Sequence, residues 1–142
     1  MLTETERAQL RTQKAKEIND GLTQFYGTEH YYAVSPLFRG VVMTDGARWL
    51  AEKANCFWLM ELIASYQPRC KKDKSCIDIQ FWRIEVKPDH SCSVICDRDS
   101  NDEFLRQEIP FTDFPLDSFK IWVEAGACGG KPVMVILLPS EH

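Results

Sequence analysis

Four oxygen-bearing side chains stand at the spacing of a calcium loop in the stretch CDRDSNDEFLRQE, residues 96–108. Asp97, Asp99, Asn101 and Glu108 occupy the first, third, fifth and twelfth positions, which supply side-chain ligands in a helix–loop–helix calcium site. The sixth position, normally glycine, is Asp102, which reaches the required positive φ at a cost of about 1 kcal/mol. The ligand spacing alone therefore allows a calcium site.

The flanks of this stretch argue against a helical calcium hand. Upstream, the sequence SCSVIC (91–96) alternates as a strand does, and downstream Pro110 would break an exiting helix soon after it began. The sequence DSND (99–102) is typical of a turn between two strands. We therefore predict a β-hairpin here and no metal site, with weak calcium binding at the acidic tip as the remaining alternative.

The chain has six cysteines, and four of them raise the question of zinc. Cys70 and Cys76, followed by Cys92 and Cys96, are not spaced as paired C-x2-C knuckles. If Cys92 and Cys96 lie in one strand, they are about 13 Å apart. Two thiolates on one zinc, each about 2.3 Å from the metal, lie far closer than that. We predict free thiols, no metal and no cofactor.

Carboxylates and one histidine form the set most suited to acid–base chemistry. Glu29, Asp45, Asp113 and Glu141, with His30, could serve a small-molecule site or an acid–base enzyme. Plainer roles are open as well: Asp45 can cap a helix, Asp113 can order a turn and Glu29 can be a loop charge. No residue is assigned as catalytic. The residues predicted to have a binding role are Glu29, His30, Tyr31, Tyr32, Asp45, Asp113, Trp122 and Glu141.

Trp122 is the aromatic residue most suggestive of a contact surface. The alternation around it places Phe119 inward and Trp122 outward with Lys120 and Glu124. An outward tryptophan on a sheet can anchor another protein or a second subunit. The alternative is a tryptophan covered by the N-terminal helix or by a loop.

The helices that must position these residues come first in the chain. Residues 3–20 predict a polar helix with a capping box at Thr3 and Glu6. The N-terminal segment 1–17 is expected to be a marginal or flexible helix. Ala47–Tyr66 is apolar over a wide arc and predicts the central buried helix, begun by Thr44 or Asp45 and kinked or split at Asn55.

After residue 76 the hydrophobic period changes to two, which predicts strands. Short connections favour antiparallel neighbours, and Val133–Leu138, apolar on both faces, is expected to be central. Tyr31–Val34 and Gly40–Met43 are two further strand candidates. The predicted class is α+β: a single domain, 1–142, with N-terminal helices followed by an antiparallel meander sheet of about five strands packed on a central helix. The main strands are expected at 77–87, 92–96, 104–109, 119–123 and 133–138.

Charge and composition limit the classes of partner that the protein is expected to bind. Lys and Arg number 17 and Asp and Glu 21, giving a net charge of −4, and the pI is about 5.4. A nucleic-acid partner is not expected, because such proteins normally have a basic face. No run approaches the roughly 20 apolar residues that span a membrane, and the N-terminus has no apolar signal segment. We expect a cytoplasmic protein whose partner is another protein or a second copy of itself.

Four strings occur together in order: FYGTEHYY (25–32), TDG (44–46) with LAEKA (50–54), FTDFPL (111–116) and ILLPSE (136–141). Together they resemble a family of small bacterial proteins classed only as a domain of unknown function, from about residue 22 onward. Members of that family look like cargo of plasmids and other mobile elements as often as chromosomal proteins. The resemblance implies no activity and no functional residues.

Three hypotheses for function follow. The leading one is a small, non-enzymatic protein-interaction module, which the resemblance suggests is a mobile-element accessory that binds or inhibits a host or defence protein. The second is a small-molecule-binding protein or acid–base enzyme that uses the carboxylates and His30. The third is a homodimeric structural accessory that uses the sheet face around Trp122.

Overall fold

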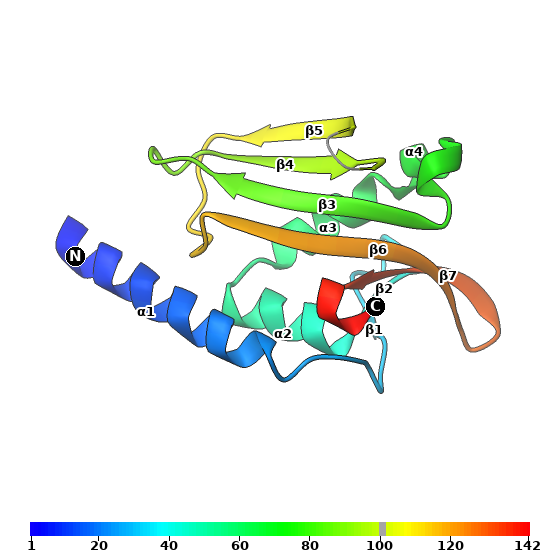
Figure 1. The fold of residues 1–142 in the computed structure, drawn as a ribbon, viewed down its shortest axis with the longest axis horizontal. Helices are drawn as coiled ribbons and strands as arrows, with labels where there is room; N and C mark the ends of the chain where they lie inside the picture. The colour runs from blue at the N-terminus through cyan, green and yellow to red at the C-terminus, as the bar shows by residue number, and fades with distance from the viewer. Residues whose placement is uncertain (100–101) are drawn as a thin grey trace.

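The computed structural model describes residues 1–99 and 102–142 as one mixed sheet with helices packed on one face (Figure 1). Ser100 and Asn101, which belong to the predicted hairpin tip, lie outside the described residues. The fold is α+β with an N-terminal helix, as predicted.

The sheet has seven strands among the described residues, in the order β1-β2-β7-β6-β3-β4-β5. β2 and β7 are parallel, and the other neighbours are antiparallel. The strands are β1 (Tyr32–Ala33), β2 (Val41–Met43), β3 (Ile79–Val86), β4 (Cys92–Asp97), β5 (Glu103–Ile109), β6 (Ser118–Cys128) and β7 (Lys131–Leu137).

The predicted five-stranded antiparallel meander matches this sheet only roughly. β1 and β2, which the sequence offered as further candidates, join the sheet and make it mixed, because the long chain between β2 and β7 allows a parallel crossover. The connectivity is not a simple meander either, because β6 returns beside β3 after the β4–β5 hairpin. The expectation of a central strand at Val133–Leu138 is confirmed, because β7 lies between β2 and β6.

The helical part begins with a long polar helix and continues with shorter apolar ones. The elements are α1 (Glu4–Leu22), α2 (Asp45–Lys53), α3 (Phe57–Ser65), α4 (Gln67–Cys70) and the 3₁₀ turns η1 (Lys74–Cys76) and η2 (Pro139–Glu141). The predicted helix at Ala47–Tyr66 is split in two at Asn55, which has a φ of 51°. That left-handed conformation redirects the chain between α2 and α3.

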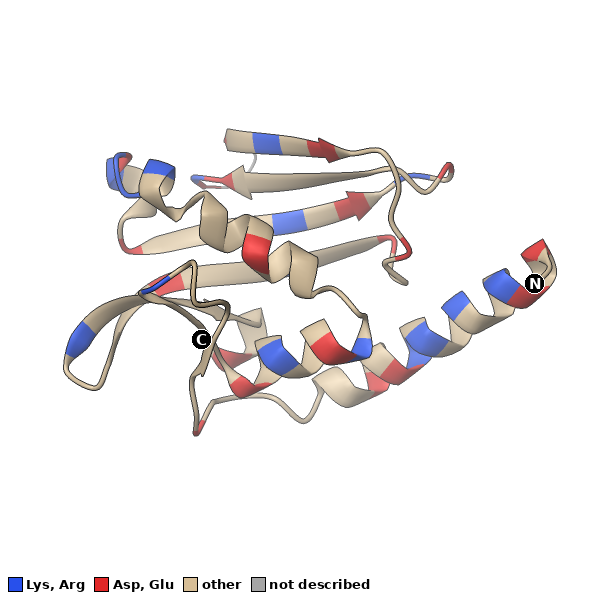
Figure 2. Ribbon diagram, turned by 180° about the vertical axis from the view of Figure 1, so that it is seen from behind, with Lys and Arg blue, Asp and Glu red and all other residues tan. Residues whose placement is uncertain are grey.

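The core lies between α2–α3 and the covered face of the sheet. Seen from behind, α3 crosses in front of the strands, and α2 lies between the sheet and α1 (Figure 2). Leu50, Leu59 and Ile63 from the helices are fully buried with Trp82 and Ile121 from the sheet. The alternation of β3 and β6 therefore puts Trp82 and Ile121 on the helix side and leaves Phe81 and Trp122 on the other face.

The opposite face of the sheet carries ion pairs instead of helices. Arg83 Nε lies 2.8 Å from Asp97 Oδ2, and Arg83 also pairs with Glu85. On β5, Arg106 lies 2.7 Å from Glu103 and 3.1 Å from Glu108. Cations and carboxylates therefore neutralise one another across this open face.

α1 joins the hydrophobic core only near its end, as its sparse apolar residues predict, although Arg11 in its first half pairs with Asp117. Ile18 is its only buried residue. At Gly21 the helix lies so close to Trp49 that a Cβ there would come within 2.3 Å of the indole. The missing side chain at Gly21 therefore lets Trp49 pack directly against the helix backbone.

The acidic stretch at 97–108 forms a β-hairpin and not a helical calcium hand. Asp97 pairs with Glu103 near the tip, whereas Glu108 pairs with Ser93 toward the other end of the strands. Five residues of strand place Glu108 about 17 Å from Glu103. The first and twelfth positions of the suspected loop thus cannot share one ion. No helix within 1–99 or 102–142 is long and apolar enough to cross a membrane.

Candidate functional site

The first residue cluster with site-like chemistry surrounds the start of α2, and we name it the α2 cap cluster. Its members are Thr28, Glu29, His30, Tyr32, Thr44, Asp45 and Glu141. Thr44 is the N-cap of α2: its Oγ1 accepts from the Ala47 N–H at 3.2 Å and donates to Glu141 Oε1 at 2.6 Å. The Glu141 carboxylate also accepts from the N–H groups of Gly46 and Leu138, at 3.0 and 2.9 Å. One carboxylate thus joins the end of β7 to the start of α2.

Asp45 joins the same helix to the segment before β1. Its Oδ2 accepts from the Glu29 N–H at 2.9 Å, and its own N–H donates to Thr28 Oγ1 at 2.9 Å. The Glu29 N–H lowers the pKa of Asp45, and the hydroxyls of Tyr32 and Thr28 lower it further against the opposing effect of desolvation. His30 Nδ1 lies 3.8 Å from Asp45 Oδ1. Asp45 is therefore held ionised by its neighbours.

The α2 cap cluster brings together five of the residues predicted to bind, and in it Asp45 and Glu141 serve as hydrogen-bond acceptors. Both carboxylates accept from backbone N–H groups and hold loops to α2. The side chains of Glu29 and His30 are exposed, and Tyr32 lies under the Arg48 guanidinium, 4.2 Å from its ring centre. Tyr31 is 40% exposed. The geometry is that of a structural tie between three segments.

Asp113 lies away from the α2 cap cluster. The two Thr-Asp pairs of the sequence, Thr44-Asp45 and Thr112-Asp113, are therefore at separate places in the structure. Asp113 is close enough to Cys56, just beyond the end of α2, to contribute to the raised pKa of that thiol. Asp45 is the first residue of the nine-residue α2. It therefore lies about 13 Å, along the helix axis, from the end of α2 that is near Cys56 and Asp113. Asp113 belongs instead to the groove described below.

Trp122 lies on the open face of the sheet and is half-buried. Its ring packs edge-on against Phe81, with centroids 5.2 Å apart, and against His142, with centroids 5.3 Å apart. His142 is held there by Glu124, with Nδ1 and Oε2 2.7 Å apart. Trp122 is thus covered in part by the C-terminal residues and not by α1.

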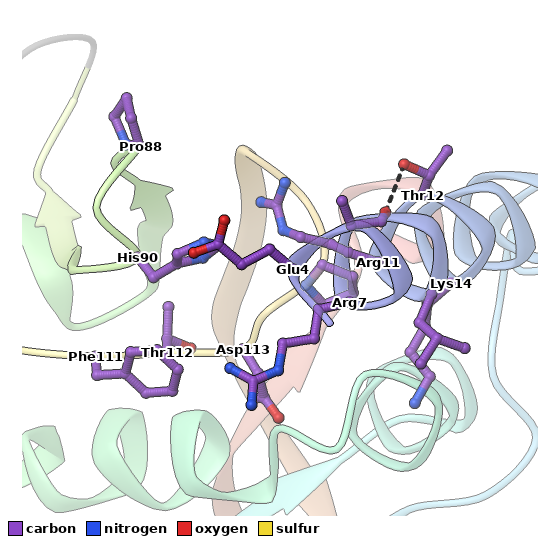
Figure 3. Close-up of a pocket in the computed structure, with 13 residues that line it drawn as sticks. Glu4, Arg7, Arg11, Thr12, Lys14, Pro88, His90, Phe111, Thr112 and Asp113 are labelled. Carbon is purple, nitrogen blue, oxygen red and sulfur yellow. Dashed lines mark hydrogen bonds between the residues drawn. The ribbon is translucent and has the colours of Figure 1, made fainter. Parts of the chain in front are cut away.

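A second candidate site is the groove between the first half of α1 and two connecting segments, which we name the α1 groove. The cavity has a volume of about 890 Å³ (Figure 3). Its lining residues are Glu4, Arg7, Ala8, Leu10, Arg11, Thr12, Lys14, Pro88, His90, Phe111, Thr112, Asp113 and Pro115. A smaller cavity of about 410 Å³ shares Arg11, Pro88 and His90 with it, so the hollow continues past Arg11.

Charged side chains face one another across the α1 groove without joining. Arg7 points toward Asp113 and Glu4 toward His90 (Figure 3). Within the described residues, the side chains of Arg7, Lys14 and Asp113 form no hydrogen bond or ion pair. Arg11 pairs with Asp117 at 3.1 Å, yet its Nε is buried without a partner. The groove therefore has charged groups available to a ligand.

Two large apolar side chains border the same groove. Phe111 is 68% exposed and Leu10 is 55% exposed. The His90 ring lies 6.1 Å from the Phe111 ring. Sequence reasoning singled out Asp113 but missed the other groove residues. One signal was present: Arg7, Arg11 and Lys14 recur at i, i+4 and i+7, which places them on one face of a helix.

The cysteines form no arrangement that could hold a metal within the described residues. Cys70, Cys76 and Cys96 are buried together, and hydrogen bonding to Cys70 and burial raise the pKa of Cys96. Burial raises the pKa of Cys76 to about 11 and that of Cys56 to about 12. Cys92 lies elsewhere along β4, beside Glu108. The thiols with a raised pKa are poor nucleophiles and poor metal ligands, and they are those of Cys56, Cys76, Cys92 and Cys96.

No curated protein and no solved structure matches the chain. A family model does match, over residues 16–142. This range contains the whole α2 cap cluster, the connecting segments of the α1 groove and the last part of α1. The chain belongs to a family of unknown function, DUF6876.

Proposed function

We propose that the protein is a non-enzymatic protein-interaction module that binds an acidic segment of another protein in the α1 groove. The observation that carries the proposal is that the groove combines, among the described residues, unpaired charged side chains with exposed apolar ones. Arg7, Lys14 and Asp113 have no side-chain partner within the described residues, and Phe111 and Leu10 are largely exposed beside them. Covering a surface of this kind with a binding partner is energetically favourable.

The charge of the groove favours an acidic partner. Arg7, Arg11 and Lys14 outnumber the carboxylates Glu4 and Asp113 in the lining, although the chain as a whole has a net charge of −4. The basic residues follow one another along the first half of α1 (Figure 2). Carboxylates of a partner would find three cations within one groove, which favours their association and orientation.

The exposed aromatic side chain supplies the apolar part of the interaction. Covering a side chain such as Phe111 contributes about 2 kcal/mol. A bound segment would therefore combine acidic residues with one large apolar residue. An accessory that binds or inhibits a host or defence protein, as the family resemblance suggests, would use such a surface.

The acid–base alternative receives less support. Asp45 accepts from the exposed Glu29 N–H, and Glu141 accepts from the part-buried N–H groups of Gly46 and Leu138, which would lack an acceptor without it. Proton transfer by these carboxylates would compete with their role as hydrogen-bond acceptors. Asp113, the remaining carboxylate of that set, is at the other site.

A displayed library of random peptides, selected on the immobilised protein, tests the proposal. We expect the recovered peptides to share acidic residues and one large apolar residue. Their affinity, measured by fluorescence anisotropy, should fall about tenfold or more for Phe111→Ser, and also for Lys14→Glu.

Leu37→Ser is the matched control. Leu37 is an apolar side chain that is 84% exposed and lies outside the groove lining, so its replacement should leave peptide affinity unchanged. If no peptide is recovered, or if the recovered peptides bind Phe111→Ser as tightly as the native protein, the groove is not a binding site.

A further inference from the structure

β5 is the outermost strand of the sheet at the end away from β1. In both views no other helix or strand lies beyond its outer edge (Figures 1 and 2). The strand is seven residues long, whereas the other edge strand, β1, has two. An edge strand of this length presents a row of backbone N–H and C=O groups that can pair with a further strand.

From Leu105 to Ile109, the side chains of β5 alternate between the two faces of the sheet. Leu105 and Ile109 stand opposite Cys96 and Cys92, on the face that α3 covers. Arg106 and Glu108 are on the open face, where Glu108 stands opposite Ser93. Gln107 stands between Leu105 and Ile109 on the covered face, where its Oε1 accepts from the Tyr66 hydroxyl at 2.6 Å. A strand added at this edge must therefore match apolar residues around one polar position on the covered face and charged residues on the open face.

β5 itself meets this requirement, provided that the two copies pair in one register. We propose that β5 docks antiparallel on β5 of a second copy of this chain, with the two-fold axis at Gln107. In this register Leu105 stands opposite Ile109 of the second copy. Arg106 stands opposite Glu108 of the second copy, and symmetry forms the same pair again on the other side of the axis. The inference is independent of the α1 groove.

Neighbouring registers are excluded by charge. Shifting the axis by one residue to Arg106 puts two arginines opposite each other, and shifting it to Glu108 puts two glutamates opposite each other. Like charges directly across an antiparallel pair repel, and opposite charges attract. The sequence of the strand thus selects Gln107 as the centre.

Arg106 can join the second copy without giving up its present contacts. It already bridges Glu103 at 2.7 Å and Glu108 at 3.1 Å in its own strand. Its four hydrogen bonds, which include one from Nη1 to Ser93 Oγ at 3.2 Å, use four of the five guanidinium N–H donors. The second N–H of Nη2 remains for a carboxylate across the new strand pair. The Arg106 side chain is 41% exposed and that of Glu108 is 53% exposed, so both are accessible to the second copy.

Sedimentation equilibrium of the full chain tests the pairing. We expect the native protein to reach about twice the 16.4 kDa mass of one chain as its concentration rises. Arg106→Glu puts only carboxylates at positions 106 and 108 of the two strands, and Glu108→Arg puts only cations at those four positions. Each variant alone should remain monomeric.

A mixture of the two variants gives the decisive test of the proposed pairing. In a mixed pair, both carboxylates of the Arg106→Glu strand stand opposite guanidinium groups of the Glu108→Arg strand, so the mixture should recover the dimer mass. Lys131→Glu, a charge reversal at an exposed residue of β7 and away from β5, should dimerise like the native protein. Thermal unfolding checks that each exposed-residue variant is folded. A monomeric native protein, a dimeric single variant or a mixture that stays monomeric would each overturn the proposal.

Discussion

The α2 cap cluster and the α1 groove are built from the same residue types but use them in opposite ways. In the cluster, Asp45 and Glu141 accept hydrogen bonds from backbone and hydroxyl groups of their own chain. In the groove, Arg7 and Asp113 point toward each other without forming an ion pair. A polar residue that already has all its partners stabilises the fold, whereas one that lacks them is available to another molecule.

The comparison also explains what the recognisable strings in this sequence encode. FYGTEHYY, TDG and ILLPSE contribute Thr28, Asp45 and Glu141 to the same cluster, although they are far apart in the chain. The part of α1 that lines the groove precedes residue 16, where the family match begins. Three of the four strings therefore describe how the fold is tied together. The fourth, FTDFPL, contributes Phe111 and Asp113 to the α1 groove, whose other side comes from α1 residues that precede the family match.

Removing Glu141 should produce the largest effect on stability. Glu141→Ala leaves Thr44 Oγ1 and two backbone N–H groups without their acceptor, so we expect the free energy of unfolding to fall by about 2 to 3 kcal/mol. Urea denaturation measures it. Glu29→Ala removes an exposed carboxylate from the same cluster and should change the value by less than about 0.5 kcal/mol. Equal losses for the two variants would contradict a tie centred on Glu141.

Gly46→Ala should be the next most harmful change. A Cβ at this position would lie 2.6 Å from Glu141 Oε1 and 2.8 Å from Leu138 Cδ1. We expect a loss of about 1 to 2 kcal/mol, because overpacking forces the buried neighbours apart. Gly27→Ala is the control, because nothing lies within 4 Å of a Cβ there. The close packing at α2 would be in doubt if both variants unfolded at the same urea concentration.

Acid should loosen the α2 cap cluster through Asp45. The pKa of Asp45 is below its ordinary value of 3.8, so the ionised carboxylate stabilises the folded state above that pH. This contribution is lost as the pH falls through the lowered pKa. Asp45→Asn should therefore flatten the acid side of a plot of melting temperature against pH, measured from about pH 7 to pH 2. An unchanged acid slope would mean that Asp45 does not hold the segment.

Charge reversal in the α1 groove should have the smallest effect on stability. Lys14→Glu breaks no bond in the described structure, so the free energy of unfolding should shift by less than about 0.5 kcal/mol. The same variant is expected to lose peptide affinity. A large loss of stability would show that the groove residues are structural after all, and the contrast between the two regions would fail.

Much of the fold followed from local patterns in the sequence. Alternation located the strands from β3 to β7, and the cap at Thr44 and the break at Asn55 were both readable. The strand pairing was harder, because β1 and β2 are two and three residues long and carry little periodic signal. The α1 groove could not be predicted, because it depends on where a polar helix with one buried residue docks against distant connections.

The position of β7 has a consequence for how the chain is made. A ribosome adds residues in order, and β7, the last strand, lies between β2 and β6. β1 and β2 therefore cannot join the sheet until residues 131–137 have been synthesised. Until then the apolar sides of β2 and α2 lack their covering, and Glu141 is not there to hold the start of α2. Nascent chains should need protection from aggregation during this interval, which a chaperone that holds exposed apolar segments could supply.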